Sequence, residues 1–110
     1  MTEIKSEGAG VVRIADEVIA VIAATAALET EGVVMRKHMA RGVSVSVTGT
    51  TAVIGMAISV KFGKKLQAVS AEVQQRVKSA IETMTGLTVA EVNVSVSALV
   101  AEQRQQKRRT

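Results

Sequence analysis

The chain has 110 residues, 47% of them hydrophobic and 22% charged, so we expect a single domain built around one core. It holds no cysteine and a single histidine, which excludes a disulfide framework and a thiolate metal site. The formal charge of +4 is unevenly placed: Arg36 to Arg41 carries three positive charges, and residues 101–110 carry four positive charges and one negative charge, which leaves −2 for the rest.

The first nine residues are polar and show no hydrophobic periodicity. We expect residues 1–9 to form a flexible N-terminus, and they lack the apolar stretch of a signal peptide. Val11 to Ile14 predicts a short strand. A helix is predicted to begin at Ala15 or Asp16, because acidic side chains are favourable at the positive end of a helix.

This first helix is predicted to be apolar on all sides. No charged residue occurs from Val18 to Leu28, a run too short to span a bilayer, which needs about 20 residues. Such a helix must be covered on more than one side. We expect it to pack on a sheet and on a second helix and to leave a strip that includes Ala23 and Ala27 for a partner. The alternative is that helix packing covers this strip entirely.

A basic segment follows the helix, which is predicted to end between Glu29 and Gly32. Clustered positive charge attracts anionic lipid or nucleic acid, although it also occurs in solvated loops and termini that only aid solubility. His38 has no second ligand beside it, so we predict no metal site, no catalytic residue and no cofactor. The candidate contacts with an anionic partner are Arg36, Lys37, Arg41, Arg104, Lys107, Arg108 and Arg109.

The stretch from Val43 to Phe62 predicts a β-hairpin. Valine alternates with serine and threonine from Val43 to Thr48, as in a strand with one buried face, and Gly49 with Thr50 forms a tight turn. The second strand is predicted to run from about Thr51 to Phe62. Its apolar face carries Ala52, Ile54, Met56, Ile58, Val60 and Phe62, and its other face carries mostly small side chains.

A second helix and a last strand complete the predicted elements. Apolar residues at steps of three or four form one stripe on the helix: Leu66, Val69, Val73, Val77, Ile81 and Met84. Gly86 provides the left-handed residue that ends a helix, and Leu87 is placed to fold back toward Ile81. The strand is predicted from Thr88 to Leu99, with alternating valines on one face and Asn93, Ser95 and Ser97 on the other.

The element order is therefore strand, helix, strand, strand, helix, strand. It predicts a single α+β domain with a four-stranded, mainly antiparallel sheet and both helices on one face. The other face of the sheet would be almost uncharged, and exposed sheet surfaces without charge tend to be occupied by another surface. The candidate self-association surface consists of Ser44, Ser46, Gly55, Ala57, Ser95 and Ser97, together with Ala23 and Ala27 of the first helix.

Three segments of the sequence resemble those of a known protein family. The runs IETMTGLTVAEVNVSVSAL, GVVRIADEVIAVIAATAALETEGV and VKFG resemble the alkaline shock protein 23 family of envelope stress response proteins. The resemblance covers residues 10–99, and residues 100–110 form a basic tail outside it. It implies an abundant bacterial protein linked to envelope stress. Some members of this family lie under the membrane through a small membrane-anchored partner, and the family supplies no catalytic residues.

The expected function is therefore that of a non-enzymatic structural or interaction module. It would form homo-oligomers and be recruited to the cytoplasmic face of the cell membrane, with anionic lipid as a second contact. Phosphate-binding glycine motifs do not occur, and we expect no small-molecule substrate. The alternative is a sequence-nonspecific nucleic-acid-associated protein that uses the basic segments, but Phe62 is the only aromatic residue for base stacking and is predicted to face the core. An accessory subunit of an enzyme is a third hypothesis.

Overall fold

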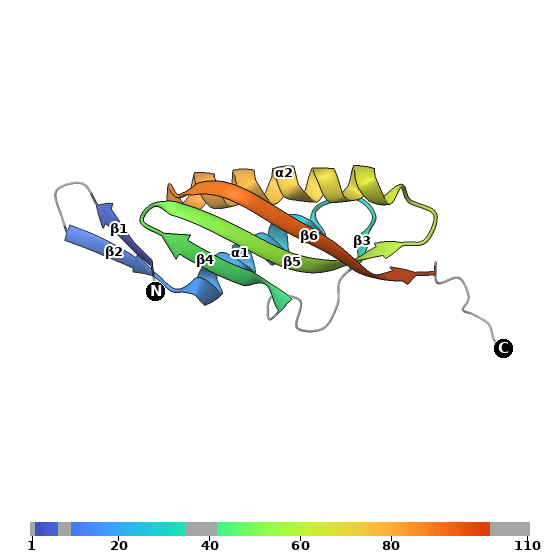
Figure 1. The fold of residues 1–110 in the computed structure, drawn as a ribbon, viewed down its shortest axis with the longest axis horizontal. Coiled ribbons are helices and arrows are strands. Elements are labelled where there is room, and N and C mark those ends of the chain that lie inside the picture. The colour runs from blue at the N-terminus through green and yellow to red at the C-terminus, as the bar shows by residue number, and fades with distance from the viewer. Residues whose placement is uncertain (1, 7–9, 35–41, 102–110) are drawn as a thin grey trace.

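A computed structural model describes residues 2–6, 10–34 and 42–101 (Figure 1). Two helices, α1 (Asp16–Leu28) and α2 (Leu66–Thr85), cover one face of a four-stranded sheet. The sheet consists of β3 (Val33–Val34), β4 (Ser44–Thr48), β5 (Thr51–Lys61) and β6 (Thr88–Val100). The predicted α+β fold with both helices on one face is therefore confirmed.

The central strand of the sheet is β5. Along one edge it pairs in parallel with β6, from Thr51 opposite Thr88 to Lys61 opposite Val100. Along the other edge it pairs antiparallel with two short strands, β4 beside its first half and β3 beside its second. Two of the three pairings are thus antiparallel, and the third is parallel because α2 carries the chain back across the sheet between β5 and β6.

The predicted strand at Val11 to Ile14 forms but does not join this sheet. It is β2 (Gly10–Ile14), which pairs antiparallel with β1 (Thr2–Ser6) in a separate two-stranded sheet. Part of the terminus expected to be flexible is therefore strand. The fourth strand of the main sheet is β3 instead, because the left-handed turn at Gly32, with φ of 98°, brings the chain back beside the end of β5.

The core lies between the helices and the sheet. Alternate residues of β5, among them Ile54 and Ile58, are fully buried against Ile19 of α1 and against Val73 and Val77 of α2. Burying each such side chain stabilises the fold by about 1.5–3 kcal/mol. The apolar side chains at every second residue of β5 thus pack in one layer with those at every third or fourth residue of α2.

The ends of two elements differ from the predicted pattern. Phe62 is 72% exposed, because β5 ends at Lys61 and the alternation that was expected to turn Phe62 inward stops with it. Met84 is 68% exposed, and Thr85 takes the buried position in the last turn of α2. The predicted helix stop is confirmed: Gly86 has φ of 78° and donates its N–H to the carbonyl of Glu82.

Candidate functional site

The candidate site is the face of the sheet that the helices leave uncovered. We call it the open sheet face and define it as the side chains of β4, β5 and β6 that point away from the helices. The strand register aligns Ser44, Gly55 and Asn93 in one row and places Ala57 beside Ser95 in the next. The exposed or half-buried residues of this face are Ser44, Ser46, Thr48, Thr51, Val53, Gly55, Ala57, Lys61, Glu91, Asn93, Ser95 and Ser97. Ser59 shares the alternation of β5 but is 1% exposed, so this part of the face is not accessible.

Most of this face is accessible and uncharged. Of the six sheet residues predicted to form a self-association surface, five are exposed and Gly55 is half-buried. The register brings five of the six onto one surface. Ser97 is exposed but falls at the register irregularity after Val96, where its hydroxyl donates to the carbonyl of Ile58. The charged members of the open sheet face are Glu91, in the row of Val53, and Lys61, the last residue of β5. Such a surface loses little solvation energy when another surface covers it, because few charges must be removed from water.

The middle of the open sheet face is flattened by a glycine. The Ser44 hydroxyl lies over Gly55 and donates to its carbonyl oxygen at 3.4 Å. A Cβ atom added at Gly55 would lie 2.7 Å from the Ser44 Oγ but 4.0 Å from the Ser44 Cβ. The side chain of one strand therefore occupies the space that the neighbouring strand leaves empty.

We expect Gly55→Ala to lower the free energy of unfolding by no more than about 0.5–1.5 kcal/mol, the contribution of one hydrogen bond, because the blocking Ser44 Oγ ends an exposed side chain that can turn away. The added methyl group forces the Ser44 hydroxyl away and removes its hydrogen bond. The double variant Gly55→Ala with Ser44→Ala should lose little more than Gly55→Ala alone, because both substitutions remove the same hydrogen bond. Urea denaturation of both variants and of Ser44→Ala alone measures this coupling, and additive effects would contradict the close contact.

The predicted alanine strip of α1 does not lie on the surface. Ala23 and Ala27 are both 0% exposed, so they cannot contact a partner. Their small side chains let α1 pack closely on α2 and on the sheet, which is the covering that the sequence left as the alternative. The exposed side of α1 carries Val18, Val21 and Thr25.

The remaining predicted contacts are the basic residues and Phe62. The seven basic residues proposed to meet an anionic partner, Arg36, Lys37, Arg41, Arg104, Lys107, Arg108 and Arg109, lie outside the described residues. Phe62 is exposed rather than buried, so it is available for stacking. It is one aromatic side chain, whereas RNA-recognition sheets stack two or three bases on theirs.

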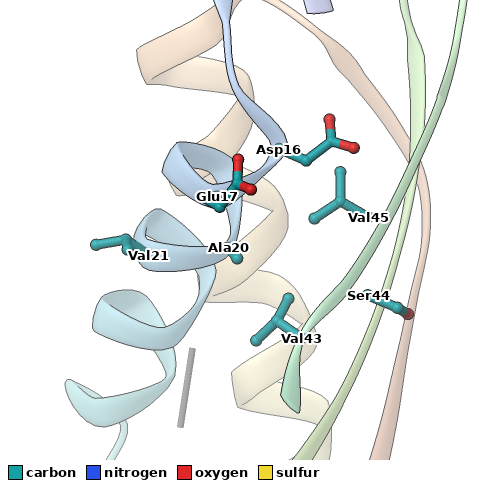
Figure 2. A pocket seen from close by; sticks show the side chains of 7 residues that line it. All are labelled: Asp16, Glu17, Ala20, Val21, Val43, Ser44 and Val45. Atoms are coloured by element: carbon teal, nitrogen blue, oxygen red, sulfur yellow. The ribbon is translucent and has the colours of Figure 1, made fainter. Parts of the chain in front are cut away.

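A groove of about 580 Å³ lies between α1 and β4 (Figure 2). Its walls are apolar and include Ala20, Val43 and Val45, and the carboxylates of Asp16 and Glu17 stand at its rim. Ser44 projects from the opposite side of β4 in this view. Sequence reasoning missed this groove because it exists only where α1 crosses β4, two elements far apart in the chain.

The groove and the open sheet face hold little reactive chemistry. The groove combines two carboxylates with an apolar floor, and the open sheet face offers mainly hydroxyl and backbone groups. Among residues 2–6, 10–34 and 42–101, no group of three or more histidine, cysteine, aspartate or glutamate side chains could hold a metal ion. Neither described helix is long and apolar enough to cross a membrane.

One known protein family matches most of the chain. The alkaline shock protein 23 family, described by its cell envelope-related function, matches residues 4–101. The uncharacterized protein YqhY of Bacillus subtilis (strain 168) is 31% identical in an alignment 112 positions long, which covers 89% of this chain and 83% of YqhY. YloU of the same organism is also 31% identical, in an alignment 106 positions long that covers 82% of this chain and 88% of YloU.

Solved structures share the fold. A MamM CTD variant, H264A-E289A-C267S, superposes with a TM-score of 0.52 at 19% identity, over 80% of this chain and 96% of that one. The H285A variant gives a TM-score of 0.53 at 18% identity, over 81% of this chain and 100% of that one. At these identities the similarity extends to the fold alone.

Proposed function

The chain belongs to the alkaline shock protein 23 family, whose function is cell envelope-related, and on this basis we propose that it is a non-enzymatic structural module that self-associates through its open sheet face. The observation that carries this proposal is the exposed, nearly uncharged surface of β4, β5 and β6. Solvent-facing sheets of soluble domains normally carry interspersed charge of both signs. Here that charge is confined to Glu91 and Lys61, and Ser44, Ala57 and Ser95 lie between them.

The assembly would work at the cytoplasmic face of the cell membrane. The basic segments at residues 36–41 and 101–110 would contribute about 1 kcal/mol per basic residue near an anionic lipid surface. A small membrane-anchored protein, as the family resemblance implies, would supply the remaining attachment. Multiple copies joined through the open sheet face would present many such basic segments at once, so weak single contacts would add up to firm binding.

This proposal predicts that a charge in the middle of the open sheet face weakens assembly. Ala57→Lys places an ammonium group beside Ser95, and burying this unpaired charge in a contact should weaken self-association at least tenfold. Ala71→Lys is the matched control, because Ala71 is an exposed residue of α2 and receives the same charge.

Sedimentation velocity over a range of protein concentration measures the effect. We expect the wild type and Ala71→Lys to form concentration-dependent oligomers, and Ala57→Lys to need at least tenfold higher protein concentration to form oligomers of the same size. A wild type that is monomeric throughout would overturn self-association. If both lysine variants assembled equally, the self-association contact would have to lie outside the open sheet face.

A further inference from the structure

The outer edge of β6 is covered along only part of its length. In the part of the chain that the structure describes, β6 pairs with β5 alone, so its other edge faces away from the sheet. Two side chains of α2 reach the backbone at its beginning: Glu82 accepts the N–H of Val89 at 2.8 Å, and Gln74 donates to the carbonyl of Val92 at 2.9 Å. No described side chain makes such a contact between Val94 and Leu99.

The hydrogen bonds of β5 show which backbone groups of β6 point outward. The N–H of Lys61 donates to the carbonyl of Gly32 on the β3 side, and the N–H of Phe62 donates to the carbonyl of Val100 in β6. The backbone groups of alternate residues of β5 therefore point to opposite edges of the strand. Ile54 and Ile58 therefore bond toward β6. In a parallel ladder such a residue bonds to the neighbours of its partner, and its partner points its own N–H and C=O away.

Val92, Val94 and Val96 are the partners of Ile54, Met56 and Ile58. Their N–H and C=O groups accordingly lie on the outer edge. The contact between Gln74 and the carbonyl of Val92 agrees with this direction. Val92 is therefore satisfied by α2, whereas Val94 and Val96 present their donors and acceptors to whatever approaches the edge.

We propose that this segment of β6 pairs antiparallel with the same segment of a second copy of the chain, so that two sheets become one continuous sheet. This inference deepens the proposed function and rests on it, because it assigns one contact of the self-association. An exposed and uncharged strand edge is a template for another strand, and proteins that avoid such pairing place lysine, proline or a bulge there. From Val92 to Val100 the sequence VNVSVSALV has no charge and no proline, and its one irregularity follows Val96.

The segment is self-complementary, which favours a second copy as the occupant. A twofold axis at Ser95 places Val94 of each copy opposite Val96 of the other, where the two residues exchange both hydrogen bonds. The same axis places Ser95 opposite Ser95 and Asn93 opposite Ser97. Valines then meet on the helix side and small polar residues meet on the open sheet face, which continues across the two copies.

Proline at Val96 tests the backbone contact. Because the N–H of Val96 points outward, Val96→Pro removes no bond to β5 and closes the edge to another strand. Val96→Ala is the matched control, because it also shortens this half-buried side chain but keeps the N–H. We expect Val96→Pro to raise the dissociation constant at least tenfold relative to Val96→Ala, with urea denaturation used to verify that both are folded.

Cysteine cross-linking tests the register without disturbing the fold. The chain has no cysteine, so Ser95→Cys introduces a single thiol. Across the axis two such residues form a non-hydrogen-bonded pair with Cβ atoms about 4.5–5.5 Å apart, close to disulfide distance. Asn93→Cys is the control on the same face, since the two copies of residue 93 are displaced by about 13 Å along the strands.

We expect oxidation to convert Ser95→Cys into a covalent dimer at least tenfold faster than Asn93→Cys. Equal rates for the two cysteine variants, or equal association of Val96→Pro and Val96→Ala, would overturn the edge pairing and leave self-association standing. A wild type that stays monomeric in sedimentation would overturn the edge pairing and the proposed function together.

Discussion

Replacing Ile81 by alanine is expected to lower the free energy of unfolding by about 2–5 kcal/mol. Ile81 is 0% exposed and lies in the core between α2 and the sheet. Truncation removes buried apolar atoms and leaves a cavity that the surrounding side chains fill only in part. In a domain of this size such a loss is a large share of the whole stability. Urea denaturation followed by circular dichroism measures it.

The control for this variant is Met84→Ala. Sequence periodicity places Met84 and Ile81 on the same apolar stripe, whereas the structure leaves Met84 68% exposed. We therefore expect Met84→Ala to change stability by no more than about 0.5 kcal/mol. If the two variants lost comparable stability, the last turn of α2 would be packed differently from the structure described above.

The second large effect is expected at Thr85, the last residue of α2. Its buried hydroxyl donates to the carbonyl of Ile81 at 2.6 Å and accepts the N–H of Leu87 at 3.1 Å, so it joins the end of the helix to the chain beyond Gly86. Thr85→Val keeps the shape of the side chain but leaves the N–H of Leu87 without its partner. We expect a loss of about 1–3 kcal/mol in the free energy of unfolding.

The same substitution at Thr30 should have the opposite sign. Thr30 is 2% exposed, and its Oγ1 has no hydrogen-bond partner among the described residues. Thr30→Val removes a buried hydroxyl that makes no hydrogen bond to any described residue, so we expect the free energy of unfolding to rise by about 1–3 kcal/mol. Thermal and urea denaturation of both valine variants check this pair, and a destabilised Thr30→Val would show that its hydroxyl is satisfied.

Several features of the site depended on periodicity and were predictable. The alternation of valine with serine along β4 and β6 predicted Ser44, Ser46, Ser95 and Ser97 on one surface, and the strand register aligns the first three on one side of the sheet. Hydrophobic spacing also identified the buried stripe from Val69 to Ile81. Both patterns arise within single elements, where the geometry of a helix or a strand decides which side chains share a face.

Features that depend on two elements were not predictable in the same way. The spacing of Ala23 and Ala27 is equally compatible with a buried and an exposed side of α1, and only its packing on α2 and the sheet makes them inaccessible. The prediction of the fourth strand of the sheet was wrong for a similar reason. The edge of β5 is occupied by β3, whose two residues are too few to produce a periodic signal.

By itself, then, the sequence determined the order of the main helices and strands, the buried faces of β4, β5, β6 and α2, the stop at Gly86 and the family, because these depend on local spacing and on recognisable sequence motifs. Only the tertiary structure decided the groove beside α1, the exposure of Phe62 and the part of the β6 edge that α2 covers. These features exist where elements distant in the chain meet. Their positions follow from how the whole core packs, a property that no single stretch of sequence contains.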